Sequence, residues 1–542
     1  MSEGTEKKQE KRPKFQAIKG TRDLLPPDTE LWNRVEQTAH EVFGTFGFGE
    51  IRPPIFEPTE LFARAVGGDT DIVSKEMYTF EDRPTELPDF RRESFDIVQS
   101  TEEVIKRFET GELPQSPLNR SLIAFLKSDL PRWTSANTRL LEATGPTHEG
   151  LEEYRKALSR LITHLQMFQL GELTSLRPEA TASVCRAYIE HGMHAWAQPV
   201  KLYYLGPMFR RERPQKGRYR QFYQIGAEVL ETVQPGQGGA KDIPKDAAVD
   251  AEVIEMVMTF FARLGLEGVQ LEINSIGHAA PSVDGKEVCR RGYVQKLKAA
   301  LEKVKDKLGA DSQRRIETNP LRVLDSKLES EQAIIAGLPK IVDHLCEDCA
   351  KQYVEVKRQL DLRCVKYTEN WRLVRGLDYY MRTTFEITAK GLGSQNAVCG
   401  GGRYDGLVEL LGGPPTKGIG FAIGEDRLIL SLQETGHSPL ATRHSSLVYI
   451  AWMGEKAQAT AIKTAQKLRD AGYRVELPPV EQKFGKALGQ ADKLGARYAL
   501  ILGEDEIATG QWTVKTLADG SQAKMSELEF LERLKKERVV SS

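Results

Sequence analysis

Three things are scarce in this sequence: long apolar runs, net charge and cysteine. No apolar run approaches the roughly 20 residues of a membrane-spanning helix, so the sequence predicts no membrane span. The 76 basic and 77 acidic side chains leave a formal charge of -1, which excludes a globally basic nucleic-acid coat but not a local basic patch. Six cysteines among 542 residues are few and are typical of a reduced cytoplasm.

One cysteine pair has the spacing of metal ligands. Cys346 and Cys349 form a C-E-D-C sequence, and the other cysteines are dispersed: Cys185, Cys289, Cys364 and Cys399. A structural zinc ion needs four ligands, and this pair lacks two. We therefore expect free thiols and no zinc, with a metal site as the less favoured alternative.

Length and composition predict several domains. With 40% hydrophobic and 28% charged residues the chain resembles an ordinary globular protein, and its length suggests three or four units of about 100 to 200 residues. Residues 1–16 mix acids and bases without an apolar segment, so we expect a disordered tail and no signal peptide. Residues 17–440 contain long strand patterns and little strand–helix alternation, which favours an α+β core on an antiparallel sheet.

Three segments depart from this pattern. Residues 446–542 alternate strands and helices, which predicts a small α/β domain with a parallel sheet. Residues 289–368 have Lys, Leu, Glu and Arg at helical spacing, which predicts a helical insertion. Residues 83–170 are longer than one connection in a compact domain, and only Leu151–Phe168 shows a strong helical pattern there.

The longest informative stretch, Lys201–Glu231, predicts a β-hairpin with a basic tip. The cations at the tip are Arg210, Arg211, Arg213, Lys216, Arg218 and Arg220. Alternate side chains of the second strand face opposite sides. One face is apolar and predicts core: Tyr223, Ile225, Ala227 and Val229. The other face carries an aromatic ring, an amide, a gap and a carboxylate: Phe222, Gln224, Gly226 and Glu228.

Contact with water is the simplest interpretation of that second face, as in many half-solvated antiparallel strands. However, glycine is costly inside a strand and often marks the close approach of a ligand or backbone. The cations at the tip repel one another unless an anion is present. Together these features favour a binding site.

Further motifs are weaker when taken alone. The segment Arg177–Thr181 predicts the end of a strand and the start of a helix, with Glu179 in the first helical turn. The triple glycine Gly400–Gly402 predicts either a turn or a close approach of backbone to ligand. Arg427 lies in the first turn of a predicted helix, where a cation is mismatched to the helix dipole. Either neighbouring acids offset it or it forms a phosphate site with the helix terminus.

These residues resemble the histidyl-tRNA synthetases, a family of class II aminoacyl-tRNA synthetases. The resemblance extends from about Ala17 to the C-terminus, apart from residues 83–170, which the family's usual pattern does not include. The segments that carry it are A-I-K-G-T-R-D-L-L-P-P-D, D-T-D-I-V-S-K-E-M-Y-T-F-E-D, F-R-R-E-R-P-Q-K-G-R-Y-R-Q-F, R-G-L-D-Y-Y, G-G-R-Y-D-G-L and G-F-A-I-G-E-D-R-L.

The resemblance implies an enzyme that activates L-histidine with ATP and transfers it to tRNA(His). It implies that Arg210 and Arg375 flank the α-phosphate, that Phe222 stacks on adenine, and that Arg427 holds the ATP tail. The residues implied around histidine are Glu179, Ala180, Thr181, Gln224, Glu228, Arg375, Tyr379, Tyr380 and Tyr404; Thr181 would also contact ATP. A carboxylate at 228 would bind either the α-ammonium group or an imidazole N–H. Arg375 alone, ahead of a strand, could equally be a surface charge.

The same resemblance implies partners and location. The tRNA acceptor end would meet the hairpin tip at Arg213, Gln215, Lys216 and Arg218, and the C-terminal domain would read the anticodon. Magnesium would accompany ATP, with ligands that the sequence does not identify. We expect a cytoplasmic homodimer with its interface around Glu50–Phe62. Two alternative hypotheses are a regulatory subunit of ATP phosphoribosyltransferase and a noncatalytic tRNA-binding sensor. Eroded catalytic motifs would be expected in both, whereas Arg210, Arg375 and Arg427 are intact in this sequence.

Overall fold

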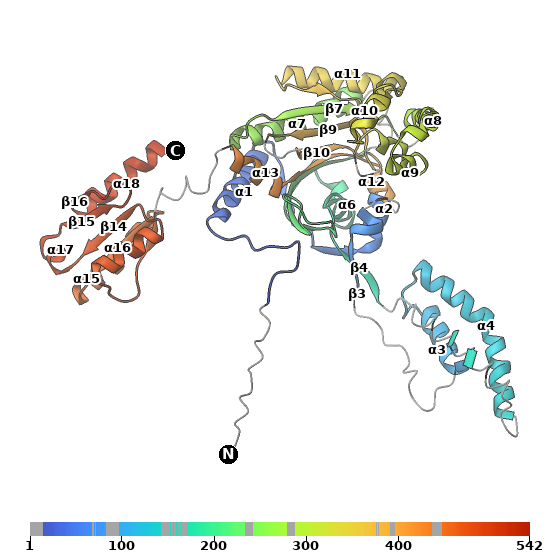
Figure 1. The fold of residues 1–542 in the computed structure, drawn as a ribbon, viewed down its shortest axis with the longest axis horizontal. Coiled ribbons are helices and arrows are strands. Elements are labelled where there is room, and N and C mark those ends of the chain that lie inside the picture. Colours follow the sequence, from blue (N-terminus) through green and yellow to red (C-terminus); the bar gives the residue numbers. More distant parts are fainter. Residues whose placement is uncertain are drawn as a thin grey trace, which may run out of the picture.

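A computed structural model gives the fold (Figure 1). It describes residues 15–67, 70, 72–82, 97–142, 171–233, 242–278, 288–375, 377, 379–390, 396–435 and 447–541, and isolated positions between 152 and 163. The expected tail over residues 1–16 lies almost wholly outside them.

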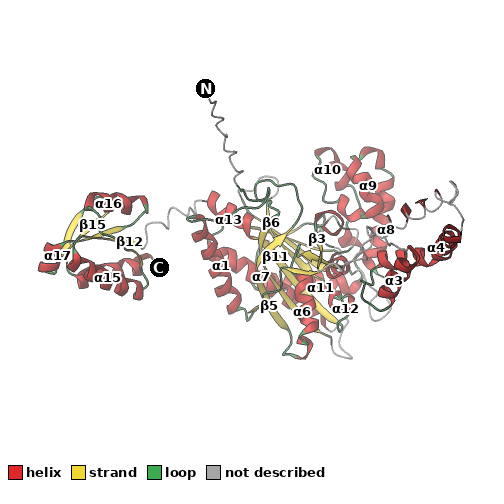
Figure 2. Cartoon of the chain, turned by 90° about the horizontal axis from the view of Figure 1, so that it is seen from below, coloured by secondary structure: helices red, strands yellow, loops and turns green. Residues whose placement is uncertain are grey.

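The main domain is built on an eight-stranded sheet with the order β1-β5-β6-β11-β10-β9-β7-β8 (Figures 1 and 2). Its strands are β1 (Gly49–Glu50), β5 (Val200–Phe209), β6 (Gln221–Thr232), β7 (Gln270–Ser275), β8 (Thr368–Glu369), β9 (Met381–Thr388), β10 (Ala397–Arg403) and β11 (Thr416–Gly424). The two edge pairs, β1 with β5 and β7 with β8, are parallel. The pairs between them are antiparallel, which confirms the predicted α+β class.

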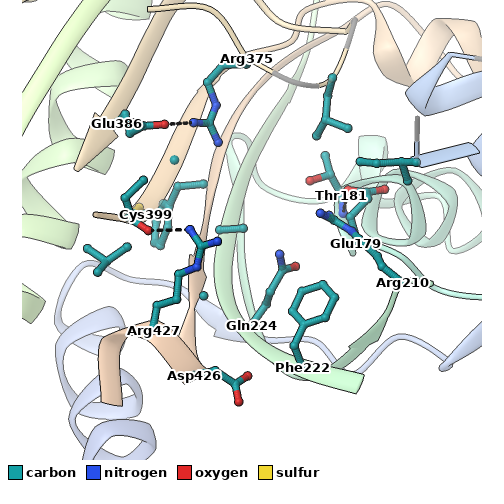
Figure 3. A pocket seen from close by; sticks show the side chains of 18 of the residues that line it. Glu179, Thr181, Arg210, Phe222, Gln224, Arg375, Glu386, Cys399, Asp426 and Arg427 are labelled. Carbon is teal, nitrogen blue, oxygen red and sulfur yellow. Dashed lines mark hydrogen bonds and ion pairs between the residues drawn. The ribbon is translucent and has the colours of Figure 1, made fainter. Parts of the chain in front are cut away.

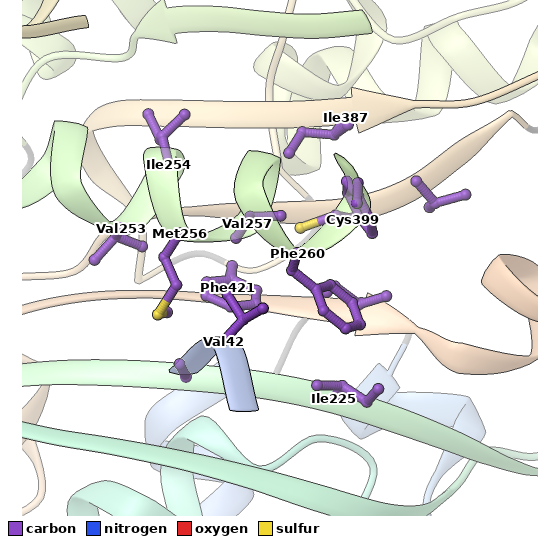
Figure 4. Packing of buried hydrophobic residues seen from close by; sticks show 14 of the residues in the cluster. Val42, Ile225, Val253, Ile254, Met256, Val257, Phe260, Ile387, Cys399 and Phe421 are labelled. Carbon is purple, nitrogen blue, oxygen red and sulfur yellow. The ribbon is translucent and has the colours of Figure 1, made fainter. Parts of the chain in front are cut away.

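Three helices cover one face of this sheet: α1 (Asp28–Thr45), α7 (Ile243–Leu264) and α11 (Glu347–Leu362). Helix α7 directs Val253, Val257 and Phe260 into a core that also contains Ile225 and Phe421 from the strands (Figure 4). Full burial of each such side chain contributes about 1.5–3 kcal/mol, so this face anchors the sheet. Core packing on this side leaves the opposite face of the central strands available for a site.

The opposite face is only partly covered. Helices α2 (Thr59–Val66), α6 (Thr181–Glu190) and α12 (Leu407–Leu410) pack there against a second core. A small sheet, β2 (Phe56–Pro58), β4 (Glu172–Leu176) and β3 (Tyr78–Asp82), lies beside them, with a π-helix over Ile72–Glu76. Helix α13 (Glu425–Glu434) follows β11 directly.

The chain between β7 and β8 is helical, as the residue spacing predicts. It contains α8 (Cys289–Glu302), α9 (Ala310–Thr318), α10 (Glu329–Ala336) and α11, with 3₁₀ turns at Lys305–Lys307, Pro320–Val323 and Ile341–His344. Helices α8, α9 and α10 share a core that includes Tyr293, Leu297 and Ile335 from the insertion and Tyr380 from the main domain. The insertion therefore packs against the segment that leads into β9.

The segment between β3 and β4 contains two helices outside the Leu151–Phe168 stretch, where the sequence shows its strongest helical pattern. They are α3 (Ile97–Glu109) and α4 (Pro117–Glu142), which pack on each other around Val104, Leu122 and Leu126 (Figure 1). Pro131 lies inside α4, and a proline in a helix interior costs about 3 kcal/mol. The residue pattern alone therefore disfavours a helix here. The helix predicted over Leu151–Phe168 lies largely outside the described residues.

The C-terminal domain has a five-stranded sheet with the order β13-β12-β14-β15-β16. Its elements are β12 (Leu447–Trp452), α15 (Glu455–Asp470), β13 (Arg474–Glu476), α16 (Phe484–Lys493), β14 (Tyr498–Leu502), α17 (Glu504–Thr509), β15 (Trp512–Thr516), β16 (Gln522–Met525) and α18 (Glu527–Ser541). The first three strands are parallel, as predicted, but β15 and β16 add antiparallel pairs. Among the described residues, no helix is both long and apolar enough to cross a membrane.

Candidate active site

A cavity of about 330 Å³ opens on the uncovered face of the large sheet (Figure 3). Strands β5, β6, β9, β10 and β11 form its floor, and the residues before α6 and in α13 form its walls. Volumes of 300–1,000 Å³ are usual for small-molecule sites. The lining brings together residues that are dispersed between positions 72 and 427 of the chain.

A buried carboxylate, Glu228 on β6, lies beside this cavity. Thr181 Oγ1 donates to Glu228 Oε1 at 2.7 Å, and Tyr404 Oη donates to Glu228 Oε2 at 2.5 Å. Burial raises the pKa of Glu228 to about 8 despite these two donors. The carboxylate is therefore poised to release a proton when a cationic group arrives.

Glu179 supports the helix that supplies Thr181. Its carboxylate accepts the backbone N–H groups of Thr181 at 2.8 Å and Ala182 at 3.0 Å. Helix α6 begins at Thr181, so Glu179 precedes the helix, which corrects its expected place in the first helical turn. Burial raises the pKa of Glu179, and the two amides lower it. Ala180 is fully buried between these polar residues.

Three tyrosines cluster at the same end of the cavity, and two of them, Tyr379 and Tyr380, line it. The ring centroids of Tyr379 and Tyr380 lie 4.7 Å apart, and those of Tyr379 and Tyr404 lie 5.7 Å apart. Burial raises the pKa of Tyr380 to about 12, so its hydroxyl stays protonated at neutral pH. Tyr379 and Tyr380 thus give this end of the cavity aromatic walls, and Tyr404 connects them to the buried Glu228 carboxyl group beside the cavity.

Strand β6 presents its second face to the cavity, as the alternation predicts. Phe222 and Gln224 line it, whereas Tyr223 and Ile225 pack on the opposite side (Figure 3). Arg210, just after β5, donates from Nε to the Pro178 carbonyl at 2.9 Å and lies 5.2 Å from the Phe222 ring. The guanidinium is thereby fixed at one wall.

Arg375 lies at the opposite wall from Arg210 (Figure 3). Its Nη1 pairs with Glu386 Oε2 on β9 at 2.7 Å. Its Nε is buried and has no hydrogen-bond partner among the described residues. A buried N–H without an acceptor is costly, which favours an acceptor supplied by a ligand.

Arg427 approaches the cavity from α13. Its Nη1 donates to the Ala397 carbonyl at 3.1 Å, and burial lowers its pKa, as does the nearby Arg218. Asp426 bonds instead to Arg22 Nη2 at 2.7 Å and to the Tyr223 amide at 2.9 Å. Asp426 thus ties the N-terminal segment to the site, a role that sequence reasoning missed because the partners are about 200 and 400 positions away.

Glycines in the floor make room for the functional side chains. A Cβ at Gly400 would lie 1.9 Å from Arg375 Nη2, and one at Gly420 would lie 1.6 Å from Glu228 Oε2. Likewise, a Cβ at Gly226 would meet Tyr204 Oη at 2.3 Å, and one at Gly418 would meet the Tyr404 ring. The close approach predicted for Gly400 is therefore to a protein side chain, and the approach predicted for Gly226 is to the Tyr204 side chain and the Phe421 carbonyl.

A second polar network, which sequence reasoning also missed, surrounds Arg403, the residue before Tyr404. Arg403 is almost fully buried and contacts Asp250 Oδ1 at 2.5 Å and Asp405 Oδ1 at 2.9 Å. It also donates to the Asp246 carbonyl at 3.0 Å. Breaking such a buried pair leaves an uncompensated charge, so the network holds β10 and Tyr404 in place.

The basic hairpin tip is exposed beside the cavity. Its outer side chains are Arg213, Gln215, Lys216 and Arg218. Arg218 pairs with Glu212 at 3.2 Å, and Lys216 pairs with Glu434 at 3.2 Å. Pairs of this kind contribute only about 0–1 kcal/mol, so both cations remain able to exchange these partners for phosphates.

The structure also supplies the two ligands that the C-E-D-C pair lacked. His278, Cys289, Cys346 and Cys349 place their ligand atoms within 4.8 Å of one another. The argument against zinc from a missing pair of ligands is therefore wrong, because the remaining two come from residues about 60 and 70 positions away.

The comparisons with known proteins agree over nearly the whole chain. A family model described as histidyl-tRNA synthetase matches residues 146–428, and one described as anticodon binding domain matches residues 447–537. The chain is 44% identical to a histidine–tRNA ligase of Koribacter versatilis, with 95% of each chain covered. It is 43% identical to one of Solibacter usitatus, with 96% of this chain and 99% of the other covered.

Solved structures give the same picture. The apo histidyl-tRNA synthetase of S. aureus superposes with a TM-score of 0.62 at 30% identity and covers 96% of this chain and 100% of its own. The histidyl-tRNA synthetase of Nostoc sp. PCC 7120 gives a TM-score of 0.58 at 18% identity, with 96% and 99% covered, and supports the fold.

Proposed function

We propose that histidine and ATP react in this cavity, because the chain belongs to the histidyl-tRNA synthetase family. The chain is an ATP-dependent ligase that joins histidine to tRNA. The reaction forms histidyl-adenylate and pyrophosphate, then passes histidine to the 3′ end of tRNA(His) and releases AMP. The observation that carries the assignment is a buried acidic pocket flanked by two arginines in one cavity.

Histidine occupies the acidic end in this proposal. Glu228 binds a cationic or N–H group of the substrate, and Thr181 and Tyr404 orient the carboxylate through their hydroxyls. Gln224 has a buried Oε1 without a partner among the described residues, which fits an additional N–H donor on the substrate. Glu179, Tyr379 and Tyr380 complete the walls, and the buried Ala180 lies next to Glu179 in the chain.

ATP occupies the basic end. Phe222 stacks on adenine, Arg427 holds the phosphate tail, and Arg210 and Arg375 approach the α-phosphate from opposite walls. Charge develops on the oxygens of that phosphate as the histidine carboxylate attacks it in line. Guanidinium groups fixed before the reaction stabilise this charge without reorganising, which is why their anchoring by Pro178 and Glu386 matters. Magnesium enters with ATP.

The remaining parts of the chain serve the tRNA. The acceptor end meets Arg213, Gln215, Lys216 and Arg218 at the hairpin tip, and the C-terminal domain, residues 446–542, binds the anticodon. We place the catalytic domain at residues 17–440, with insertions at 83–170 and 289–368. The protein acts in the cytoplasm as a homodimer, and the exposed Ile55 and Phe56 in the Glu50–Phe62 segment fit a subunit interface.

Separate binding measurements test the two subsites. Calorimetric titrations with histidine and with a nonhydrolysable ATP analogue should show that Glu228→Gln weakens only histidine binding and that Arg427→Ala weakens only nucleotide binding. The exposed-pair variant Arg358→Ala is the matched control and should change neither affinity. Equal loss of both affinities in both folded variants would contradict the division of the cavity.

A further inference from the structure

A cluster of four residues, three of them in the 289–368 insertion and one just before it, is not used by the reaction described above. His278 follows β7, Cys289 is the first residue of α8, Cys346 precedes α11, and Cys349 lies in the first turn of α11. His278 and Cys349 are buried, and Cys289 and Cys346 are partly buried. No carboxylate belongs to the cluster among the described residues, so its ligand set is three sulfurs and one imidazole.

The spacing of these atoms fits a tetrahedron around one metal ion. With Zn–S bonds of about 2.3 Å and Zn–N bonds of about 2.0–2.1 Å, tetrahedral geometry places two sulfurs about 3.8 Å apart and a sulfur and a nitrogen about 3.5 Å apart. Cys289 Sγ and Cys349 Sγ lie 3.8 Å apart. His278 Nδ1 lies 3.2 Å from Cys289 Sγ, 3.3 Å from Cys349 Sγ and 3.7 Å from Cys346 Sγ.

The same distances argue against the alternative of a disulfide. A disulfide bond is about 2.05 Å long, so the 3.8 Å between Cys289 Sγ and Cys349 Sγ is a nonbonded separation. The backbone also passes very close to the cluster, because a Cβ at Gly277 would lie only 2.7 Å from Cys289 Sγ. Gly277 has a φ of +64°, which side chains rarely adopt, so the backbone can pass close to the cluster only at a glycine.

We propose that His278, Cys289, Cys346 and Cys349 bind one structural zinc ion. Three thiolates and an imidazole are soft and borderline ligands that select zinc over magnesium or calcium. All four positions of the tetrahedron are taken by protein, which is the arrangement of a structural rather than a catalytic zinc. The ion joins the end of β7 to the N-termini of α8 and α11.

This zinc ion also supports the histidine pocket, an extension that rests on the proposed function. Arg290, the neighbour of Cys289, donates from Nη1 to the Tyr380 carbonyl at 2.7 Å. The Arg382 amide donates to the Gly277 carbonyl at 2.7 Å, beside His278. Loss of the metal would therefore loosen the segment that carries Tyr379 and Tyr380 into β9. The expected consequence is a raised KM for histidine with a smaller change in KM for ATP.

The test begins with metal analysis of full-length protein purified without chelator. Mass spectrometry of metals should find about one zinc ion per chain, and replacement with cobalt should give the intense visible absorption of tetrahedral thiolate-bound Co²⁺. The Cys346→Ser variant should lose zinc. Its affinity for zinc should fall by more than the roughly 10- to 100-fold that is lost when a residue hydrogen-bonded to a metal ligand is removed. The matched control is Cys364→Ser, an exposed thiol outside the cluster, which should keep its zinc.

A conservative variant guards against simple misfolding. His278→Cys offers a fourth thiolate and should retain zinc and shift the cobalt spectrum, whereas His278→Ala should bind weakly. The proposal would be overturned if well-folded, reduced wild-type protein lacked stoichiometric zinc. Full zinc content in Cys346→Ser would also overturn it, as would a Cys289–Cys349 disulfide in protein whose thiols were trapped directly in cells. Because these readouts do not involve activity, they stand whether or not the assignment of the histidine pocket holds.

Discussion

At the residue scale, hydrogen bonds and ion pairs hold the charged side chains of the cavity in position. Arg375 is held by Glu386 on one side and has an Nε without a partner among the described residues on the other. A plain surface charge would not be placed in a cavity wall opposite Arg210. The structure therefore favours the phosphate interpretation of Arg375 over the surface-charge interpretation.

Removing this guanidinium should slow the chemical step. Arg375→Ala should reduce the single-turnover rate of adenylate formation by about 10²- to 10³-fold, the usual effect of losing one transition-state donor. Rapid quenching of the first turnover gives this rate directly. Arg358→Ala, which breaks an exposed pair on α11, serves as the control and should keep the wild-type rate. A wild-type rate in Arg375→Ala would return Arg375 to a structural role.

Glu228 should make histidine binding dependent on pH. Its pKa of about 8 in the free protein means that the carboxyl group is mostly protonated at pH 7, and a bound cation favours the ionised form. Histidine binding at pH 7 should therefore release a proton, and affinity should rise as pH increases toward about 8. Calorimetry in two buffers with different ionisation enthalpies measures this release. The same proton release in Glu228→Gln would show that another group is responsible.

At the element scale, strand geometry explains both what could be predicted and what could not. The two-residue alternation of β6 predicts that Phe222 and Gln224 share a face, which the cavity confirms, because that period is a local property of a strand. The bonds from Thr181 and Tyr404 to Glu228 span 47 and 176 positions and follow only from sheet order, which local patterns do not contain. His278 and Cys289 were missed as partners of the Cys346–Cys349 pair for the same reason.

Gly400 on β10 leaves the space that the Arg375 guanidinium occupies. Gly400→Ala places a methyl group on the position of the Arg375 guanidinium, so Arg375 must move while the core on the other face is untouched. Adenylation should slow by about the same 10²- to 10³-fold as in Arg375→Ala, and the two changes combined should cost little more than either alone. Gly485→Ala in α16 is the control, because its Cβ would meet nothing within 4 Å. Additive effects of the two changes would contradict the proposed clash.

At the scale of the whole molecule, we expect the 83–170 insertion to be separable from the site. Strands β3 and β4 pair antiparallel with Asp82 opposite Glu172, so the two points where the insertion leaves and returns are neighbours. Helices α3 and α4 have a core of their own around Val104 and Leu126. The insertion extends from the tip of a β-hairpin and supplies no residue to the cavity among those described.

Deleting the insertion should therefore spare the chemistry. Replacing Thr85–Gln169 with a short Asn-Gly turn restores a hairpin that the register of β3 and β4 already supports. Histidine-dependent pyrophosphate exchange should remain within a few-fold of the full chain. Circular dichroism and thermal unfolding of the shortened protein provide the folding control. Loss of exchange in a folded, shortened protein would show that the insertion takes part in activation.

ATP–pyrophosphate exchange with purified protein, followed by charging of tRNA(His), measures whether this cavity activates histidine. We expect exchange that requires histidine, that is not supported by other amino acids, and that is followed by transfer of histidine to the tRNA. A well-folded preparation with no exchange above background would contradict the assignment of this cavity as the place where histidine is activated.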